Sequence, residues 1–507
     1  MDINISKDYM ALSRLPKSVW KLLTTPTITF GVCVMAALAA LPFSLHFSLL
    51  AISVAYVFLA YYVERKHLGA LILPPLVILA VFNFATGSLG PVLLADNIFS
   101  SDITPILATH IVDTVTFPIL LITYWHLNLK TPPMVILENN KISSTIDNKQ
   151  MHFISFTLIV FTIALHYVNI STGAGDRGQA GSFIVDTPYG FWSYFTAFSN
   201  LQFIAYMLIP YAYRCSGKPV RLALIILFSV YILFSLANSE RGAILYPLIF
   251  ITLGYWMIGG SFKRTTLTLV FLTVFTLFLV PRLGSFRGSG ALEATDLKDL
   301  PGRLNLLIES QKQYDSSTDA DSRDNRRVIG QALLGVGDPI IYSDTPSLFP
   351  FAGWERISDV LYIWMPSMFF PDKPQLLDGN MITSEYTGKY YERSGLGIRL
   401  QADLYRRFGW SGVFFGYLLY SIILSMVVRY AFRSFADKRK RIWGLMFLLF
   451  ITGFVRGAPA GTLLGTIWIF FYDYPKYLIV LWLVVHISGF FTGDTLKKQE
   501  HGQISYD

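Results

Sequence analysis

Long apolar runs alternate with short polar segments along most of this chain. Because a helix needs about 20 apolar residues to cross roughly 30 Å of hydrocarbon, runs of that length predict membrane spans. The runs that qualify lie at 27–46, 47–63, 68–86, 103–127, 151–171, 191–212, 221–237, 242–260, 265–281, 409–428, 442–458 and 463–490. The pattern therefore predicts an all-α, polytopic integral membrane protein with twelve or so transmembrane helices.

One long polar segment, 282–408, separates the ninth run from the tenth. Its mixed charges, prolines and amphipathic stretches predict a partly helical cap outside the membrane. The chain then divides into a membrane region 1–281 with nine spans, the cap 282–408, and a membrane region 409–507 with three spans and a tail. We interpret 463–490 as one kinked span, although two shorter segments would move the C-terminus to the other side.

Composition supports a membrane protein, because 53% of the residues are hydrophobic, only 15% are charged and the mean hydropathy is +0.48. Such a chain has too few polar side chains to cover a soluble surface. It is also too apolar for a disordered chain or a nucleic-acid-binding domain. The two cysteines, Cys33 and Cys215, predict neither a disulfide framework nor a metal site.

The net charge of +8 is distributed unevenly. If the N-terminus is cytoplasmic, the inside segments carry 22 Lys and Arg and the short outside loops carry three. This asymmetry predicts two cytoplasmic termini, and the alternation of the spans then places the cap on the outer side of the membrane. The cap holds 15 basic and 17 acidic residues, so the excess positive charge anchors the cytoplasmic side and does not indicate a nucleic-acid partner.

Two arginines of the short outside loops are candidates for chemistry. Arg241 lies in the tight turn Asn238–Gly242, and Arg456 lies among small residues at the end of the eleventh run. Arginine binds phosphate through a planar two-pronged contact, and a lipid diphosphate would present its oxygens at this level. The alternatives are pairing of Arg241 with Glu240, or extension of either side chain to lipid headgroups.

Other polar groups have less specific patterns. His110 and Asp113 share one face of the fourth run, as a proton relay or as a mutually satisfied buried pair. Asp473 and Lys476 have the same spacing and leave the same alternatives. The aspartates between 315 and 324 lack the glycine and the terminal glutamate of a calcium loop, so we expect a solvated stretch and no metal.

Within the cap, the aromatic and proline content of 355–374 predicts an amphipathic helix at the membrane interface, followed by a rigid turn at Pro371–Pro374. Farther along, Asp403, Arg406 and Arg407 lead into the tenth run. The two arginines would bind either a phosphate of a substrate or the headgroups of the bilayer.

Four segments resemble the Wzy-type O-antigen and oligosaccharide repeat-unit polymerases. They are the turn Ser239–Gly242, the aromatic and proline-rich stretch Trp364–Pro374, the strip Ser394–Leu396 that leads through 404–412 into a span, and Arg456–Gly457. Each motif is loose, whereas the likeness in topology covers most of the chain.

This resemblance implies a GT-C-like glycosyltransferase of the bacterial inner membrane. It would transfer a growing glycan from undecaprenyl diphosphate to a second lipid-linked repeat unit at the periplasmic face. It would use no cofactor and no metal, because arginines would neutralise the diphosphate. A chain-length regulator and a flippase would be its partners in O-antigen, common-antigen, capsule or exopolysaccharide synthesis.

The candidate site residues follow from this expectation. Arg241, Arg456, Asp359 and Glu385 are the catalytic candidates, the carboxylates serving as alternative bases. The candidates for binding diphosphate or glycan are Arg282, Arg287, Arg356, Lys373, Arg399, Arg406 and Arg407.

Two other functions remain open. An O-antigen ligase shares the donor, but its family uses a histidine in the large outer loop, and none of the eight histidines lies within 282–408. A flippase or transporter of lipid-linked oligosaccharides commonly has repeats around a site at the membrane midplane. This chain instead places nine predicted spans before the cap and three after it.

Overall fold

The structure is a computed structural model of the 507-residue chain. It describes residues 45–64, 75–84, 104–128, 148–172, 198, 201–237, 241–257, 299–316, 337–362, 365, 379–388, 398–436 and 462–492, together with scattered positions between 264 and 283. Every regular element within these ranges is helical.

Within the described residues, four helical stretches are long and apolar enough to cross a membrane. They cover Leu107–Leu127, Lys218–Leu236, Leu400–Tyr430 and Leu463–Ser488, and shorter apolar helices cover Leu50–Glu64 and His152–Val168. The chain thus has the helices of a multi-pass membrane protein.

The helices coincide with most of the predicted runs. Runs two to eight correspond to α4 (Leu45–Glu64), α5 (Pro75–Asn83), α7 (Thr104–Asn128), α8 (Asn148–Thr172), α10 (Leu201–Cys215), α11 (Lys218–Ala237) and α12 (Arg241–Met257). The tenth run corresponds to three successive elements, α18 (Leu400–Ser411), η7 (Gly412–Gly416) and α19 (Tyr417–Ala436). The twelfth run corresponds to α21 (Leu463–Trp468), η9 (Ile469–Asp473) and α22 (Tyr474–Thr492). The prediction of helices is confirmed there, whereas the run 442–458 and all but the last two residues of the run 27–46 lie outside the described residues.

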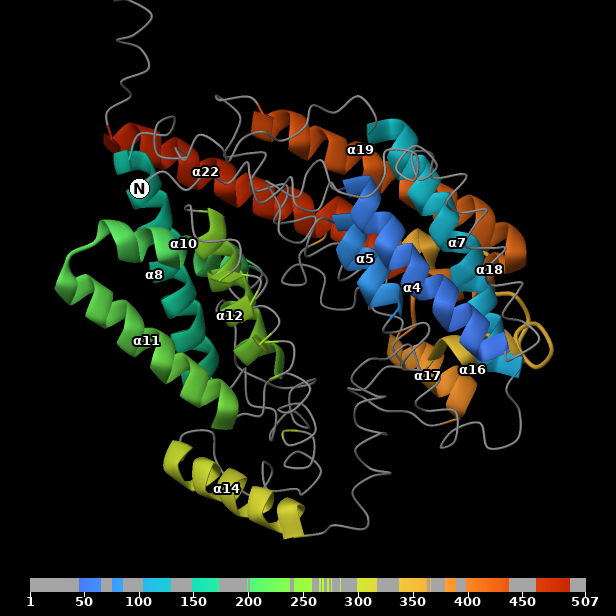
Figure 1. Ribbon diagram of the computed structural model, residues 1–507, viewed down its shortest axis with the longest axis horizontal. Coiled ribbons are helices and arrows are strands. Elements are labelled where there is room, and N and C mark those ends of the chain that lie inside the picture. The colour runs from blue at the N-terminus through green and yellow to red at the C-terminus, as the bar shows by residue number, and fades with distance from the viewer. Residues whose placement is uncertain are drawn as a thin grey trace, which may run out of the picture. The chain divides into compact units, whose positions relative to one another are not determined.

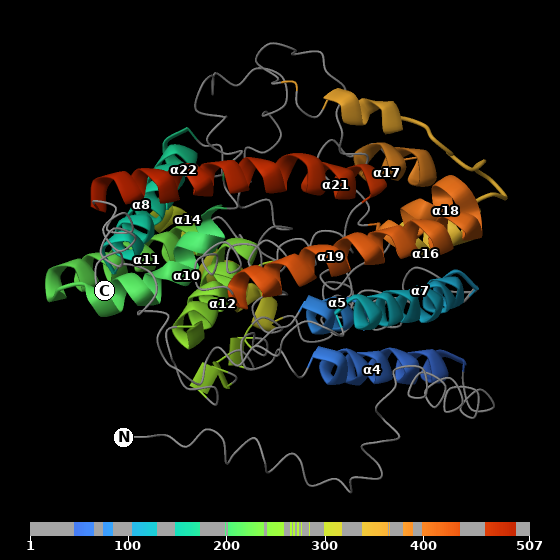
Figure 2. The same cartoon turned by 90° about the horizontal axis from the view of Figure 1, so that it is seen from above.

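The chain forms two compact units, and unit 1 comprises Met1–Asn139 and Ile329–Asp473. Helices α4, α7 and α19 lie side by side in this unit (Figures 1 and 2). The buried carboxylate of Glu64, at the end of α4, accepts hydrogen bonds from the hydroxyl of Tyr124 at 2.6 Å and from the backbone N–H of Val77 at 3.0 Å. One side chain therefore joins α4, α5 and α7.

Three shorter elements pack at one end of α7 in unit 1: α16 (Gly337–Asp344), α17 (Gly379–Thr387) and α18 (Figure 2). A single apolar cluster joins them to α7, with Val112, Ile341, Tyr342, Ile382, Tyr386, Ile398, Ala402 and Val413 as its buried members. Burying an aliphatic or aromatic side chain contributes roughly 1.5–3 kcal/mol, so this cluster holds the polar residues of α17 and α18 in fixed positions.

Two glycines shape the passage from α18 to α19. Gly409 has φ +62° and ψ −150°, a conformation that interrupts the helical backbone and that glycine adopts without a side-chain penalty. Gly412 lies so close to the preceding segment that an added Cβ would be 2.4 Å from the carbonyl oxygen of Leu404. The residues before Gly409 can therefore fold against the start of the next helical segment.

Unit 2 comprises Asn140–Val328 and Tyr474–Asp507. In it, α10 lies between α8 and α12, and α11 contacts both α12 and α14 (Leu300–Ser316) (Figure 1). Helix α11 exposes a series of large apolar side chains, as expected for a helix in contact with lipid. These side chains are Val220, Leu222, Ile225, Ile226, Leu227, Val230 and Leu233.

The predicted cap 282–408 has described residues in both units. Helix α14 belongs to unit 2, whereas α16, η6 (Ile357–Tyr362), α17 and the first part of α18 belong to unit 1. The amphipathic helix predicted at 355–374 is a short 3₁₀ helix in its described part, Ile357–Tyr362. Arg356, just before it, takes a positive φ of 58°, so no right-handed helix runs through that residue.

Candidate functional site

Among the described residues, one cluster of buried charge lies on α18. Asp403 is fully buried and shares its carboxylate between two arginines of its own helix, accepting from Arg406 Nε at 2.9 Å and from Arg407 Nε at 3.1 Å. Residues three and four positions apart share one helix face, so this arrangement follows from local spacing. The carboxylate also accepts the backbone N–H of Leu463 at 2.7 Å, which joins α18 to the start of α21.

The two arginines differ in what their remaining nitrogens contact. Arg407 Nη1 donates to the carbonyl oxygens of Gly353 and Glu355, at 3.3 and 2.7 Å, and so ties down a neighbouring loop. Arg406 Nη1 instead lies 3.9 Å from a carboxylate oxygen of Glu385. Arg407 is therefore committed to the fold, whereas Arg406 directs its charge toward an accessible carboxylate.

Helix α17 presents Glu385 through its amphipathic pattern. Ile382 and Tyr386, four residues apart, are buried in the apolar cluster, whereas Met381 and Glu385, also four apart, lie on the outer face. The side chain of Glu385 is 45% exposed, so the anchored helix holds an accessible carboxylate beside Arg406.

Tyr386 also borders this site. Its hydroxyl lies 2.7 Å from the hydroxyl of Thr345, within hydrogen-bond distance. Burial raises the pKa of Tyr386, although the bond with Thr345 and the charge of Arg406 oppose this effect. Tyr386 is therefore neutral at ordinary pH, and it adds a polar but uncharged hydroxyl to the site.

Arg399 forms a second buried cluster that joins three elements of unit 1. Its Nε donates to the carboxylate of Asp338 on α16, its backbone N–H donates to the same carboxylate at 2.8 Å, and its Nη1 donates to Asp113 on α7 at 2.8 Å. Burial by itself lowers the pKa of Arg399, but the charges of Asp113 and Asp338 outweigh burial and raise it above its ordinary value. Arg399 is consequently a permanently charged link between α7, α16 and α18.

This contact corrects one expectation from the sequence. Asp113 accepts a hydrogen bond from Arg399, which is 286 residues away, and does not form the predicted pair with His110. The hydrogen bond from the guanidinium of Arg399 is charge-assisted, which makes it a strong partner for a buried carboxylate. Lys476, expected with Asp473, lies over the rings of Phe198 and Tyr477 in unit 2.

Asp359, the other candidate base, lies in η6 and forms an ion pair with Arg356, whose Nε is 2.9 Å from the carboxylate. Arg356 also directs Nη1 to the sulfur of Met381 at 2.7 Å. Since α17 carries both Met381 and Glu385, Arg356 connects η6 to the helix that presents Glu385.

The remaining candidates are not brought to this cluster by described contacts. Arg241 is the first residue of α12 in unit 2. Arg282, Arg287, Lys373 and Arg456 lie outside the described residues. Their predicted roles stay predictions.

Sequence reasoning missed Asp338, the principal partner of Arg399. No local spacing indicates this pair, since 61 residues separate the two. The available signal was only that a carboxylate in the first turn of a helix is favoured by the helix dipole.

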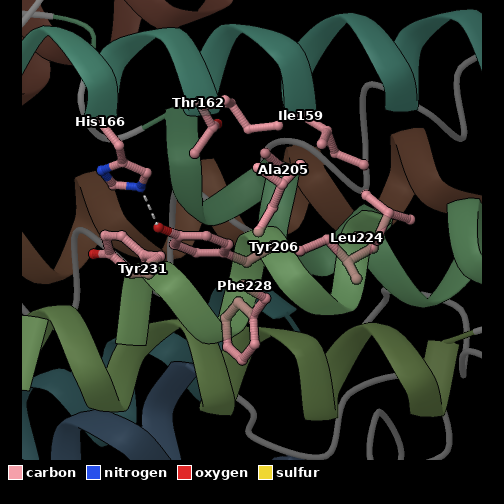
Figure 3. A pocket seen from close by; sticks show the side chains of 11 residues that line it. Ile159, Thr162, His166, Ala205, Tyr206, Leu224, Phe228 and Tyr231 are labelled. Atoms are coloured by element: carbon pink, nitrogen blue, oxygen red, sulfur yellow. Dashed lines mark hydrogen bonds between the residues drawn. The ribbon is translucent and has the colours of Figure 1, made fainter. Parts of the chain in front are cut away.

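Unit 2 contains a pocket of a different kind, lined by α8, α10 and α11 (Figure 3). Its cavity volume is about 50 Å³, and its lining is aliphatic and aromatic apart from Thr162 and a pair formed by His166 and Tyr206, whose Nε2 and hydroxyl oxygen are 2.8 Å apart. The ring of Tyr231 stacks on His166 with a centroid distance of 4.0 Å. No charged side chain lines this pocket, so it fits an apolar chain better than a phosphate or a sugar.

Metal ligation has no support within the described residues, where no group of three or more His, Cys, Asp or Glu side chains could hold an ion.

The chain matches no protein-family model, no curated protein sequence and no solved structure. Fold and site together define an all-helical, multi-pass membrane protein with a buried arginine–carboxylate cluster at the start of one of its candidate spans.

Proposed function

We propose that this protein is a glycosyltransferase that polymerises lipid-linked repeat units. It would transfer a growing glycan from undecaprenyl diphosphate to a second lipid-linked oligosaccharide at the periplasmic face of the bacterial inner membrane. The observation that carries the proposal is the placement of Arg406 beside the accessible carboxylate of Glu385, at the start of a candidate membrane span. The twelve spans, the cytoplasmic termini and the GT-C-like fold belong to the same proposal.

The reaction requires two functions that this pair could supply. A hydroxyl oxygen of the acceptor sugar attacks the anomeric carbon of the donor glycan, and the bond from that carbon to the diphosphate breaks with its electron pair. The guanidinium of Arg406 would stabilise the charge on the departing diphosphate. The carboxylate of Glu385 would take the proton of the attacking hydroxyl.

Buried partners would hold this pair in place. Asp403 fixes Arg406 by its Nε, which leaves the outer nitrogens of the guanidinium for a ligand. Arg399 and Arg407 support the fold around the site and are assigned positioning roles, instead of the direct binding roles expected from the sequence. Asp359 is the weaker candidate for the base, because its ion pair with Arg356 at 2.9 Å is closer than that of Glu385 with Arg406 at 3.9 Å, and its side chain is less exposed.

Ligands for the rest of the substrate would come from residues assigned from the sequence alone. Arg241, Arg456, Arg282, Arg287 and Lys373 remain proposed contacts of the diphosphate or glycan. A chain-length regulator and a flippase remain the proposed partners, in O-antigen, common-antigen, capsule or exopolysaccharide synthesis.

Purified protein, reconstituted with lipid-linked repeat units and no ion gradient, tests the proposal. The expected product is a ladder of longer glycans on the lipid. Glu385→Gln should slow elongation by about 10²–10⁴-fold, and Arg406→Gln by about 10²–10³-fold. Glu355→Gln is the matched control, because its carboxylate is also exposed in unit 1 but has no part in the proposed reaction.

Protein level and unfolding temperature must be measured in parallel, because Arg406 is also part of a buried cluster. Full-length polymer from both site variants would overturn the assignment of these residues. Movement of the lipid-linked units across the bilayer without elongation would identify a flippase instead.

A further inference from the structure

An exposed apolar surface lies beside the candidate site. We name the segment 345–362 the aromatic loop; it begins directly after α16 and includes η6. Leu348, Trp354 and Leu361 are 72%, 76% and 77% exposed, and Phe351 is 46% exposed. Several large apolar side chains exposed within one short segment are typical of a surface that contacts something other than water.

The aromatic loop is held firmly to α18. The backbone N–H groups of Ala352 and Gly353 donate to the carbonyl oxygens of Arg406 and Arg407 at 3.1 and 2.9 Å. In the other direction, Arg407 Nη1 donates to the carbonyls of Gly353 and Glu355. These hydrogen bonds show that the apolar side chains are presented by a built structure and not by a loose loop.

The surface continues onto a candidate membrane span. The ring of Trp354 contacts that of Phe408, with centroids 5.0 Å apart. Farther along the chain, Trp410 is 44% exposed and Phe415 is 74% exposed, both within the span Leu400–Tyr430. The exposed face of the loop thus adjoins side chains that a bilayer would cover.

The composition of the loop favours lipid over a sugar or a soluble partner. Leu348 and Leu361 are aliphatic and offer no flat ring on which a sugar could stack. Trp354 combines a large apolar ring with one N–H donor, a combination enriched where a membrane meets water. Glu355 and Ser358 are exposed among these residues, so the segment is amphipathic, as interfacial elements are.

We propose that the aromatic loop inserts into the boundary between headgroups and acyl chains, in the leaflet where the span Leu400–Tyr430 begins. Insertion would hold α18 at the depth of the lipid phosphates, because the loop is bonded to the backbone of Arg406 and Arg407. The proposal needs only the membrane span, and it stands whether or not the protein transfers glycans.

Depth-dependent quenching tests the insertion in the full chain, reconstituted into phosphatidylcholine vesicles. In a Cys33→Ser, Cys215→Ser background, Leu348→Cys or Leu361→Cys would carry a fluorophore. Lipids brominated on their acyl chains should quench these probes about twofold or more above a probe at Ser343→Cys. Ser343 is the matched control, because it is exposed on α16 in the same unit.

A charge on the loop provides a second, independent measurement. Leu348→Asp should reduce bromolipid quenching of a probe at Leu361, since a carboxylate resists transfer into the acyl region. Ser343→Asp should leave that quenching unchanged. The proposal would be overturned if bromolipids did not quench the two loop probes and aqueous iodide quenched them as strongly as it quenches the Ser343 probe. The ligand of this surface would then be a soluble partner or a glycan.

Discussion

The two units bury different kinds of side chain. Unit 1 buries three arginines against carboxylates, namely Arg399, Arg406 and Arg407. The pocket of unit 2 is lined by aliphatic and aromatic side chains around the His166–Tyr206 pair. Both arrangements lie among apolar helices. Charges removed from water are costly unless they are fully paired, and their pairing is strongly directional. Apolar side chains pack with much less dependence on direction.

This difference indicates where geometry is fixed. In unit 1 a small displacement of α18 would break several charged hydrogen bonds at once, so Arg406 is held at a defined position beside Glu385. In unit 2 a comparable displacement would repack side chains around a small cavity. A site that must orient a reacting bond is expected in the first environment.

The largest expected effect comes from removing the shared carboxylate. Asp403→Ala would leave Arg406 and Arg407 buried without their common partner, and an arginine cannot lose its charge at accessible pH. We expect the free energy of unfolding in detergent, measured by denaturant titration, to fall by about 3–5 kcal/mol.

Asp359→Ala is the matched control, because it also breaks an arginine–aspartate pair with i,i+3 spacing, but a less buried one. Its expected cost is about 1 kcal/mol or less. Equal losses in the two variants would show that burial of the α18 cluster adds nothing to the fold.

Removing Arg399 should have a smaller effect that depends on pH. Arg399→Met leaves Asp113 and Asp338 buried, but a carboxylate can take up a proton, so we expect a loss of about 3 kcal/mol near neutral pH. Burial raises the pKa of Asp338, and the charge of Arg399 opposes that rise. Without Arg399 the pKa of Asp338 should rise further.

The sign of the pH dependence follows from linkage. A carboxyl whose pKa is higher in the folded than in the unfolded state stabilises the fold below its unfolded pKa, and this contribution is lost as pH rises through its folded pKa. The deficit of Arg399→Met relative to the parent should therefore shrink as the pH falls from neutral, because the buried carboxyls of the variant take up protons. The cost of Asp403→Ala should not shrink in this way, and a deficit of Arg399→Met that stays constant would contradict the proposed link.

The close packing at Gly412 is the next test. A methyl group there would meet the carbonyl oxygen of Leu404 at 2.4 Å, so Gly412→Ala should cost about 1–3 kcal/mol, read as a lower unfolding temperature. Gly465→Ala is the control, because its Cβ would make only an ordinary contact with Thr462 at 3.4 Å. Alanine favours a helix over glycine, so that variant should be neutral or slightly stabilised.

Much of the fold was predictable, because apolar runs of bilayer length are a local signal. The helices of runs two to eight, ten and twelve appear where the sequence predicts them. The turn of the chain at Gly409 was not predictable, since a glycine before a tryptophan does not reveal a positive φ. The 3₁₀ form of Ile357–Tyr362 and the positive φ of Arg356 just before it were also missed, since the aromatic and proline content of the segment indicates neither.

The candidate site was predictable only where it is local. The spacing of Asp403, Arg406 and Arg407 places them on one helix face, and the sequence already singles out the two arginines. It cannot distinguish their roles, because the contacts of Arg407 with residues 353 and 355 and of Arg406 with Glu385 arise from tertiary packing. The contact of Arg399 with Asp113 joins positions 286 residues apart, and no local rule predicts it.

The smallest expected effect belongs to unit 2 and completes the comparison. Tyr206→Phe removes the hydroxyl that lies 2.8 Å from His166 Nε2 and donates a long hydrogen bond of 3.4 Å to Gln202, but it retains the ring, so the pocket keeps most of its packing. A neutral hydrogen bond contributes about 0.5–1.5 kcal/mol net, and the unfolding free energy should fall by that amount. Tyr167→Phe, at a position 70% exposed on the same helix as His166, should change it by less. A loss for Tyr206→Phe as large as that for Asp403→Ala would mean that unit 2 depends on its polar pair as strongly as unit 1 depends on its charges.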